Sequence, residues 1–306
     1  MIRRVQHAGQ WVFMRLEAAF NAFFGQDLNP LYHLGAIAYF FFWLALGSGI
    51  YIYIFFDTGV KDAYDSVEQL TRQWYLGGVM RSIHRYSSDG MVLAMLLHMV
   101  RHFTFDHYRN FRWFSWVTGV VLLWLVYASG INGYMLPWDR LAQFVTTATA
   151  EFLDSLPLFA GSLARNFSYR EAVNDRLFSL LSFLHIGIPL GALIALWVHT
   201  QRVARAPTVP PRPIAIALTV SMLALAAAKP AVSQGPADLG TAVNTVGLDW
   251  FYLPAFPLIY NMAPMHLGAL LAGITLLLFL VPWLPPRRAR QTGEFHVTFR
   301  PSNMAS

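Results

Sequence analysis

The sequence of 306 residues contains no cysteine. This absence excludes disulfide bonds within the chain, iron–sulfur clusters held by its own thiolates and a haem attached through a thioether. Any iron–sulfur centre that works with this protein must therefore belong to a partner chain. The sequence also lacks a glycine-rich phosphate-binding loop and the Gly-x-Ser-x-Gly turn of serine hydrolases. Neither of these two common kinds of catalytic site is predicted.

Charge is scarce as well. Only 12% of the residues are charged, whereas 56% are hydrophobic and 15% are aromatic. This balance is typical of a helical membrane protein and unlike that of a soluble domain. A helix needs about 20 apolar residues to cross a bilayer. Six segments are candidates, and 213–229 is the shortest: 34–56, 83–103, 116–136, 178–199, 213–229 and 264–284.

The net charge of +6 follows the alternation of these segments and gives no indication of nucleic-acid binding. If the N-terminus lies inside, arginines gather in the inner segments and most acids lie in the outer ones. The positive-inside rule then places both termini in the cytoplasm. The sequence thus predicts a multi-pass protein of a bacterial inner membrane, with an organelle membrane as the alternative.

The predicted fold class is an all-α membrane protein, with a four-helix bundle and two further membrane helices. Apolar residues such as Trp11 and Phe24, interspersed with Arg3 and Arg15, predict an amphipathic helix on the inner membrane surface. The chain divides into four parts: a surface helix at 1–30, a four-helix core at 31–205, two more membrane helices with an outer loop at 206–286, and a cytoplasmic tail at 287–306.

Two predicted helices each carry a pair of histidines with the same spacing. His84 and His98 are fourteen residues apart, and so are His185 and His199. Fourteen residues make just under four helical turns, so each pair lies on one face, roughly 21 Å apart. A lone histidine in an apolar helix is usually a packed residue, but ionisable residues inside a membrane are costly and usually functional. Side by side, the two helices would hold two stacked, non-covalent haem b groups, each between two imidazoles.

Glycines repeat the same interval. Gly35 and Gly49 are fourteen apart on the first predicted span, and Gly119 and Gly133 are fourteen apart on the third. Glycine inside a helix costs about 1 kcal/mol relative to alanine, but it lets a flat group approach the backbone. Close packing of helices through small residues is the alternative explanation. The spacing shared with the histidines favours clearance for haem.

Further ionisable residues lie near these histidines. Arg81 is three residues before His84, and Arg101 is three after His98. Both arginines are predicted to meet haem propionates, or to mark helix ends by extending toward the headgroups. Asp89 is predicted to be buried, either as a proton carrier or as a hydrogen-bond partner of a neighbouring serine or arginine. Three more histidines near the inner side leave a third haem as an alternative to loop or propionate contacts: His33, His102 and His107.

Together these features resemble cytochrome b of the cytochrome bc complexes over roughly residues 5–285. The segment 133–138, Gly-Tyr-Met-Leu-Pro-Trp, is similar to the Gly-Tyr-Val-Leu-Pro-Trp of that family, and Pro189 also matches. The resemblance implies that His84 and His185 ligate an outer, low-potential haem. It implies that the other pair, His98 and His199, ligates an inner, high-potential haem.

The outer quinone site of that family is altered here. The family motif Pro-Glu-Trp-Tyr, whose glutamate takes a proton from quinol, reads Leu-Asp-Trp-Phe at 248–251. Asp249 can still accept a proton, with a shorter reach, and Tyr134 is the second candidate residue of this site. Asp139 and Val145 replace small residues and are expected to charge or narrow the pocket.

The inner quinone site is altered further. Ala204 stands where the family has a histidine, and the family's acidic residue has no counterpart in 212–220. The sequence stops after the sixth predicted helix, so the last two helices of the family also have no counterpart in it.

Three functional hypotheses follow. The first, slightly favoured by the altered inner site and the missing helices, is the membrane anchor of a modular dehydrogenase or reductase. It would exchange electrons between quinone and a flavin, molybdenum or iron–sulfur subunit. The second is the quinol-oxidising cytochrome b of a bc-type complex that runs a Q cycle with iron–sulfur and c-type cytochrome partners. The third is a haem-free transporter or anchor, although no interrupted, paired helices suggest a substrate path.

Overall fold

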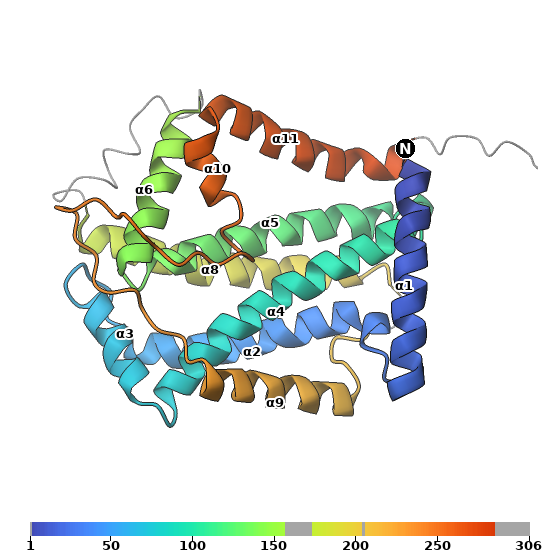
Figure 1. Ribbon diagram of the computed structural model, residues 1–306, viewed down its shortest axis with the longest axis horizontal. Helices are drawn as coiled ribbons and strands as arrows, with labels where there is room; N and C mark the ends of the chain where they lie inside the picture. Colours follow the sequence, from blue (N-terminus) through green and yellow to red (C-terminus); the bar gives the residue numbers. More distant parts are fainter. Residues whose placement is uncertain (1, 157–172, 204–205, 285–306) are drawn as a thin grey trace, which may run out of the picture.

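The computed structural model describes residues 2–156, 173–203 and 206–284. Within these ranges the regular secondary structure is helical, apart from one isolated β-bridge between Asp139 and Pro236. Most of the helices run roughly alongside one another, and others cross the two ends of the bundle (Figure 1). The main helices are α1 (Ile2–Phe24), α2 (Leu34–Phe55), α3 (Ala63–Arg72), α4 (Gly77–Thr104), α5 (Trp113–Met135), α6 (Arg140–Asp154), α8 (Asp175–Thr200), α9 (Arg212–Ala228), α10 (Phe256–Asn261) and α11 (Pro264–Leu280).

Every predicted span coincides with a helix, which confirms the fold class. Among the described residues, four helices are long and apolar enough to cross a membrane: α2, α5 with its preceding turn, α8, and α11 with its following turn. Helix α4 has 28 residues but carries more polar side chains, and α9 has only 17 residues. The protein is therefore a multi-pass membrane protein with four to six candidate spans.

The bundle is built from two closely packed helix pairs. Helix α2 packs along α4, and α5 packs along α8, with the most extensive contacts of the described fold. Helix α1 crosses one end of the bundle, and α3 and α6 lie at the other end (Figure 1). Following the predicted topology, we call the end at α1 the inner end and the end at α3 and α6 the outer end.

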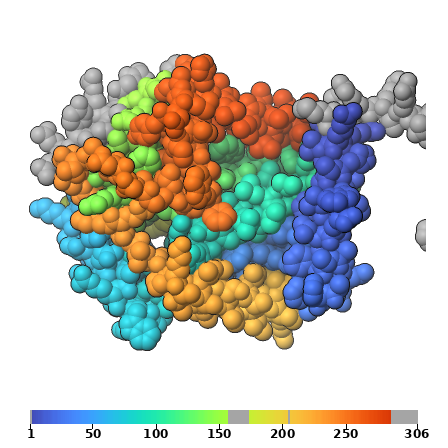
Figure 2. Space-filling model, viewed as in Figure 1, coloured from blue at the N-terminus to red at the C-terminus, as the bar shows by residue number. Residues whose placement is uncertain are grey.

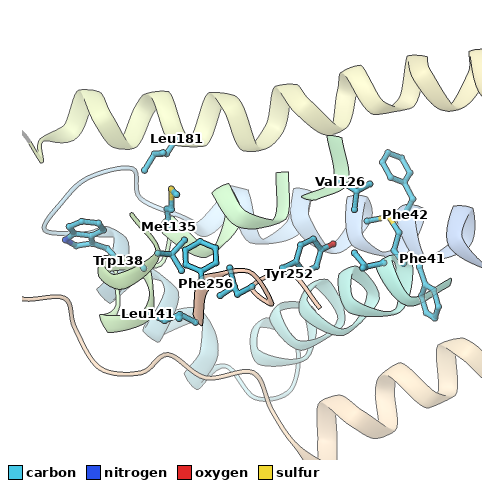
Figure 3. Packing of buried hydrophobic residues seen from close by; sticks show 14 of the residues in the cluster. Phe41, Phe42, Val126, Met135, Trp138, Leu141, Leu181, Tyr252 and Phe256 are labelled. Carbon is cyan, nitrogen blue, oxygen red and sulfur yellow. The ribbon is translucent and has the colours of Figure 1, made fainter. Parts of the chain in front are cut away.

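Apolar side chains from several elements fill the space between these pairs. Phe41 and Phe42 come from α2, Met135 from α5 and Leu181 from α8, and Tyr252 comes from the segment before α10 (Figure 3). The chain between α9 and α11 therefore contributes to the core. This packing extends from the outer end of the bundle to its middle, at Phe41 and Phe42.

The predicted surface helix forms as α1 and ends earlier than expected, at Phe24. The amides of Gln6 and Gln10 donate to the carbonyl oxygens of Phe103 and Thr104, at 2.9 and 3.0 Å, and tie α1 to the end of α4. Its exposed apolar side chains, among them Trp11 and Phe23, face away from the bundle. Figure 2 shows α1 along one side of the molecule. The predicted contact of this face with lipid stays a prediction.

Candidate functional site

The two histidines nearest the outer end face each other across the bundle. The ring centroids of His84 on α4 and His185 on α8 lie 6.0 Å apart, with the ring planes at 73°. The predicted pairing of α4 with α8 at this level is therefore present in the structure. We call these two side chains the outer histidine pair.

The other two histidines line a common cavity toward the inner end. His98 and His199 both border a space of about 670 Å³, together with Gly35 and Gly119. We call them the inner histidine pair. The remaining lining is mainly apolar, with Arg101 and Arg202 near the inner mouth. The cavity therefore combines two imidazoles with an apolar wall and a cationic edge.

Each predicted glycine lies against one of these four imidazoles. A Cβ atom added to Gly49 would lie 2.9 Å from Cε1 of His84, and one added to Gly35 would lie 3.1 Å from Cε1 of His98. On the other helix pair, the same atom of Gly133 would lie 2.6 Å from Cε1 of His185, and that of Gly119 would lie 3.3 Å from Cε1 of His199. The glycines therefore lie against the histidine rings of the adjacent helix. Clearance for haem itself, which the sequence-based interpretation assigned to them, stays a prediction.

Three of the imidazoles are oriented through their Nδ1 atoms. Nδ1 of His84 lies 2.8 Å from the carbonyl oxygen of Ala45, and Nδ1 of His185 lies 3.0 Å from that of Ser129. Because a carbonyl oxygen only accepts, Nδ1 carries the proton in both rings and Nε2 keeps its lone pair. Nδ1 of His199 lies 2.9 Å from the hydroxyl of Thr118. Such partners fix a metal-binding imidazole in the required tautomer. No pattern in the sequence predicted the two carbonyl partners, whereas Thr118 directly precedes the predicted Gly119.

These donor sets fit haem rather than a bare metal ion. Within the described ranges, no group of three or more histidine and acidic side chains could hold a metal ion by itself. Two facing imidazoles would hold the iron of a haem through their Nε2 atoms, and the porphyrin would supply the remaining nitrogen ligands. Neutral Nε2 atoms, glycine clearance and an apolar cavity all meet the needs of a non-covalent haem b. The assignment of two such groups stays a prediction.

The two predicted propionate-contacting arginines lie at opposite ends of α4. Arg81 makes an ion pair with Glu68 and donates to the hydroxyl groups of Thr71 and Ser233. Arg101 makes an ion pair with Glu17 and borders the inner cavity. Both side chains are thus held by acids of neighbouring helices. Their contact with propionates is untested.

Three further histidines border the inner cavity: His33, His102 and His107. The ring centroids of His98 and His102 are 4.3 Å apart, and those of His102 and His107 are 5.8 Å apart. His107 lies in the turn after α4, where burial and the nearby Arg112 and Arg101 lower its pKa. Its imidazole is therefore neutral at physiological pH. The alternatives of a third haem and of propionate or loop contacts both stay open.

The two residues predicted for the outer quinone site meet in a buried polar cluster. The hydroxyl of Tyr134 donates to Oδ2 of Asp249, and Nη1 of Arg85 lies 2.5 Å from the same oxygen. Oδ1 of Asp249 accepts from the backbone N–H of Phe251 at 2.7 Å. Arg85, which the sequence-based interpretation missed, follows His84 directly. Its position next to a predicted ligand was the available signal.

The same guanidinium binds the buried acid on α4. Nη1 of Arg85 lies 3.0 Å from Oδ1 of Asp89, one helical turn away. Asp89 is therefore hydrogen-bonded to a neighbouring arginine, as one of the two sequence-based alternatives predicted. Two carboxylates thus share one guanidinium at the outer end of the bundle.

Asp139 was expected to charge or narrow the outer quinone pocket, and the structure places its carboxylate at the start of α6. Its Oδ1 caps α6 by accepting from the backbone N–H of Ala142 at 2.8 Å, and its Oδ2 accepts from that of Gln234 at 2.9 Å. Val145 is fully buried within α6. Ala204, the altered inner-site position, lies outside the described residues.

The family model described as Cytochrome b/b6/petB matches residues 20–205. The protein belongs to this cytochrome b family. The chain is 32% identical over 187 residues to cytochrome b6 of Heterocapsa triquetra, and the alignment covers 58% of this chain and 84% of that protein. It is 30% identical over 176 residues to cytochrome b6 of Gracilaria tenuistipitata var. liui, covering 56% of this chain and 80% of that protein.

A solved structure described as hyperthermophilic respiratory Complex III shares the fold of this family member. The TM-score is 0.69 at 18% identity, and the match covers 83% of this chain and 75% of the other. The resemblance to cytochrome b predicted from the sequence is therefore confirmed. The named relatives favour the second functional hypothesis, a cytochrome b of a bc-type complex. They give no specific support to the preferred one, the anchor of a modular dehydrogenase.

Proposed function

We propose that this chain is the di-haem cytochrome b subunit of a bc-type complex that oxidises quinol at its outer end. The observation that carries the proposal is that the buried polar cluster is built from residues that adjoin the outer histidine pair. Arg85 adjoins His84 in sequence, and Tyr134 adjoins Gly133, which lies against His185. The cluster that holds the proton acceptor, Asp249, is therefore built from residues next to those of the predicted outer haem site.

His84 and His185 would hold one haem, and His98 and His199 would hold the other. When bound, each haem supplies a one-electron carrier that needs no open coordination position. The chain fixes three of the four imidazoles through their Nδ1 contacts. It also surrounds them with apolar helices that exclude water. Its contribution is thus to place the carriers at two depths and to set their environment.

Oxidation of a quinol to a quinone releases two electrons and two protons. Asp249 is suited to accept one proton from a quinol hydroxyl, because it is a buried carboxylate whose Oδ2 shares the guanidinium of Arg85 with Asp89. Tyr134 and Arg85 hold that oxygen in place and keep the carboxylate ionised, which is the form that can take up a proton. One electron would pass to the outer site of this chain. The second electron, together with the second proton, would pass to an iron–sulfur partner subunit, since this chain has no cysteine to hold such a centre.

The charge distribution supports a topology with the α1 end in the cytoplasm of a bacterium. Arg101, Arg109, Arg112 and Arg202 lie near this end, and they border the inner cavity or flank α5. Positive charge is retained on the cytoplasmic side of membrane proteins. The outer cluster would then release its proton to the opposite side of the membrane.

Quinol-dependent reduction of the purified complex tests this function. The chain would be isolated with its native partners, and a short-chain quinol would be added while the absorption of reduced b haem is followed. The proposal requires reduction by quinol together with transfer to a c-type cytochrome acceptor. Reduction by substrates of a flavin or molybdenum partner, with no oxidation of quinol, would instead support the modular anchor.

A further inference from the structure

Two ion pairs occupy equivalent places at the two ends of α4. Arg101, three residues after His98, pairs with Glu17 of α1, and Arg81, three residues before His84, pairs with Glu68 of α3. Helix α1 crosses the inner end of the bundle, and α3 lies at the outer end (Figure 1). Each transverse helix therefore contributes one acid to an arginine three residues from a histidine of one pair.

The inner ion pair is short and shielded. Nε of Arg101 lies 2.8 Å from Oε1 of Glu17, whose side chain is only 13% exposed. The guanidinium also lies over the rings of Tyr32 and Phe105, 5.4 and 5.3 Å from their centroids. Arg101 borders the same cavity as His98. Glu17 is the only acidic residue in α1, so its position is not part of a general acidic face.

The outer ion pair is longer but well supported. Nη1 of Arg81 lies 3.3 Å from Oε1 of Glu68 and also donates to the hydroxyl of Thr71. Nη2 donates to the hydroxyl of Ser233 at 2.8 Å. Asp65 precedes Glu68 by one helical turn and is exposed. The two acids of α3 thus differ in burial, which provides a matched control on one helix.

Partly buried charges of this kind act on a nearby redox centre. Reduction of a haem adds one electron, and a neighbouring carboxylate opposes this change more strongly where water is excluded. A glutamate that neutralises an arginine also removes cationic stabilisation of the reduced state. Both effects lower the reduction potential.

We propose that Glu17 and Glu68 are positioning residues that separately set the reduction potentials of the inner and outer haem sites. Each glutamate holds one arginine and neutralises its charge. The proposal rests on the proposed binding of two haems. Because the two acids belong to different helices at opposite ends, each acts on one site only.

Redox titration of the purified complex tests this inference. The visible absorption of the b haems is followed against ambient potential, and total haem is counted first by pyridine haemochrome. The variants are Glu17→Gln and Glu68→Gln, which keep the side-chain shape and remove the charge. Glu17→Asp and Glu68→Asp keep the charge. The controls, Asp27→Asn after α1 and Asp65→Asn on α3, remove an exposed acid at the same end of the molecule.

We expect Glu17→Gln to raise only the higher potential, that of the inner haem, and Glu68→Gln to raise only the lower one. The ratio of reduced to oxidised haem at a fixed ambient potential should rise by about three- to tenfold, where tenfold corresponds to 59 mV for a one-electron couple. The aspartate variants should shift less than the glutamine variants, and the two controls should leave both potentials unchanged.

Several outcomes would overturn the inference. Two bound haems with unshifted potentials in both glutamine variants would do so, as would equal shifts of both haems in either variant. If a glutamine variant loses its haem, the aspartate variant of the same glutamate decides. It keeps the charge but moves it away from the arginine, so it should raise the potential of its own site by a smaller amount. An aspartate variant that binds both haems with no shift at that site would overturn the inference for that pair. Absence of haem from the wild-type complex would contradict the proposed function itself, and the haem count reports that result separately.

Discussion

Gly133 of α5 lies directly against the ring of His185 on α8, so that a Cβ atom added to it would come within 2.6 Å of Cε1. Cβ atoms in proteins essentially never approach other atoms so closely. His185 is also held by the carbonyl oxygen of Ser129, at 3.0 Å from Nδ1. The ring therefore cannot turn away without losing that hydrogen bond. The position has room for glycine alone.

Gly133→Ala is expected to displace His185 and to remove the outer haem. Overpacking of this kind costs about 1–3 kcal/mol, and the added strain falls on a ligand. Haem content measured by pyridine haemochrome should drop from two to one per chain. Gly119→Ala should be milder, because its Cβ would lie 3.3 Å from His199. Gly191→Ala meets no atom within 4 Å and is the control. Equal haem loss in all three variants would contradict the contact as the cause.

His98→Ala should remove the inner haem and leave the outer one. His98 borders the inner cavity, whereas His84 and His185 form a separate pair 6.0 Å apart. The measurement is the haem count combined with the number of potentials in a redox titration. His102→Ala provides a comparison, because it removes a ring that packs on His98 without belonging to either pair. Retention of both haems in His98→Ala would refute the ligand assignment. Loss of one haem from three in His102→Ala would establish a third haem.

Asp249→Asn should slow quinol oxidation by about a hundredfold or more, in the range expected for loss of a general base. Asparagine keeps the shape but cannot take up the proton, and it weakens the ion pair with Arg85 at 2.5 Å. Quinol-driven reduction of the b haems is the measurement, with haem content checked in parallel. Asp238→Asn, an acid of the same linker that lies outside the cluster, is the control. Unchanged turnover in Asp249→Asn would show that this carboxylate takes no part in oxidation.

Thr118→Val should weaken the inner haem site through His199. The hydroxyl of Thr118 lies 2.9 Å from Nδ1 of that ring, and valine keeps the shape while removing the hydrogen bond. Loss of such a partner typically lowers metal affinity by about 10- to 100-fold. A competition assay with apomyoglobin would measure the rate of haem loss from the inner site. Thr219→Val, on α9, removes a hydroxyl that bonds only the preceding turn and should have no effect. Equal rates in the two variants would argue against a role for Thr118.

Asp139→Ala should reduce stability without altering the haems. The variant removes the cap of α6 and the bond to the backbone of Gln234. A lost cap typically costs about 1 kcal/mol, and the second bond adds to that cost. Thermal denaturation of the protein in detergent, followed by circular dichroism, should show a lower midpoint. Asp139→Asn should recover part of the loss because its amide oxygen can still cap the helix. A midpoint unchanged in Asp139→Ala would show that the cap contributes nothing.

The repeated interval of fourteen residues predicted much of this architecture, because it appears on four helices at once. It placed His84 opposite His185, and it placed the glycines on the helices that pack against those histidines. It could not show what each glycine contacts, because that depends on which pairs of helices lie closest. Here α2 packs on α4 and α5 on α8, so the nearest groups are imidazoles of the adjacent helix.

The contacts within the buried polar cluster could also be predicted only in part from the sequence. The Leu-Asp-Trp-Phe segment and Tyr134 were recognisable as matches to family motifs, and the structure brings Asp249 and Tyr134 into contact. Arg85 was missed because an arginine beside a ligand looks like a helix-end residue in the sequence. The capping role of Asp139 was not predicted, because it depends on the start of α6 and on a backbone N–H nearly 100 residues later. Such partners are fixed only by tertiary packing.

The matched intervals between glycines and between histidines also restrict how this protein can evolve. A residue inserted between Gly35 and Gly49 would rotate one of them by about 100° away from its imidazole on α4. The same holds for an insertion between the histidines of either helix. A single insertion would therefore disrupt a contact at one level of the bundle while preserving the other. We expect homologous proteins to align without gaps across all four of these intervals, even where most side chains between them differ.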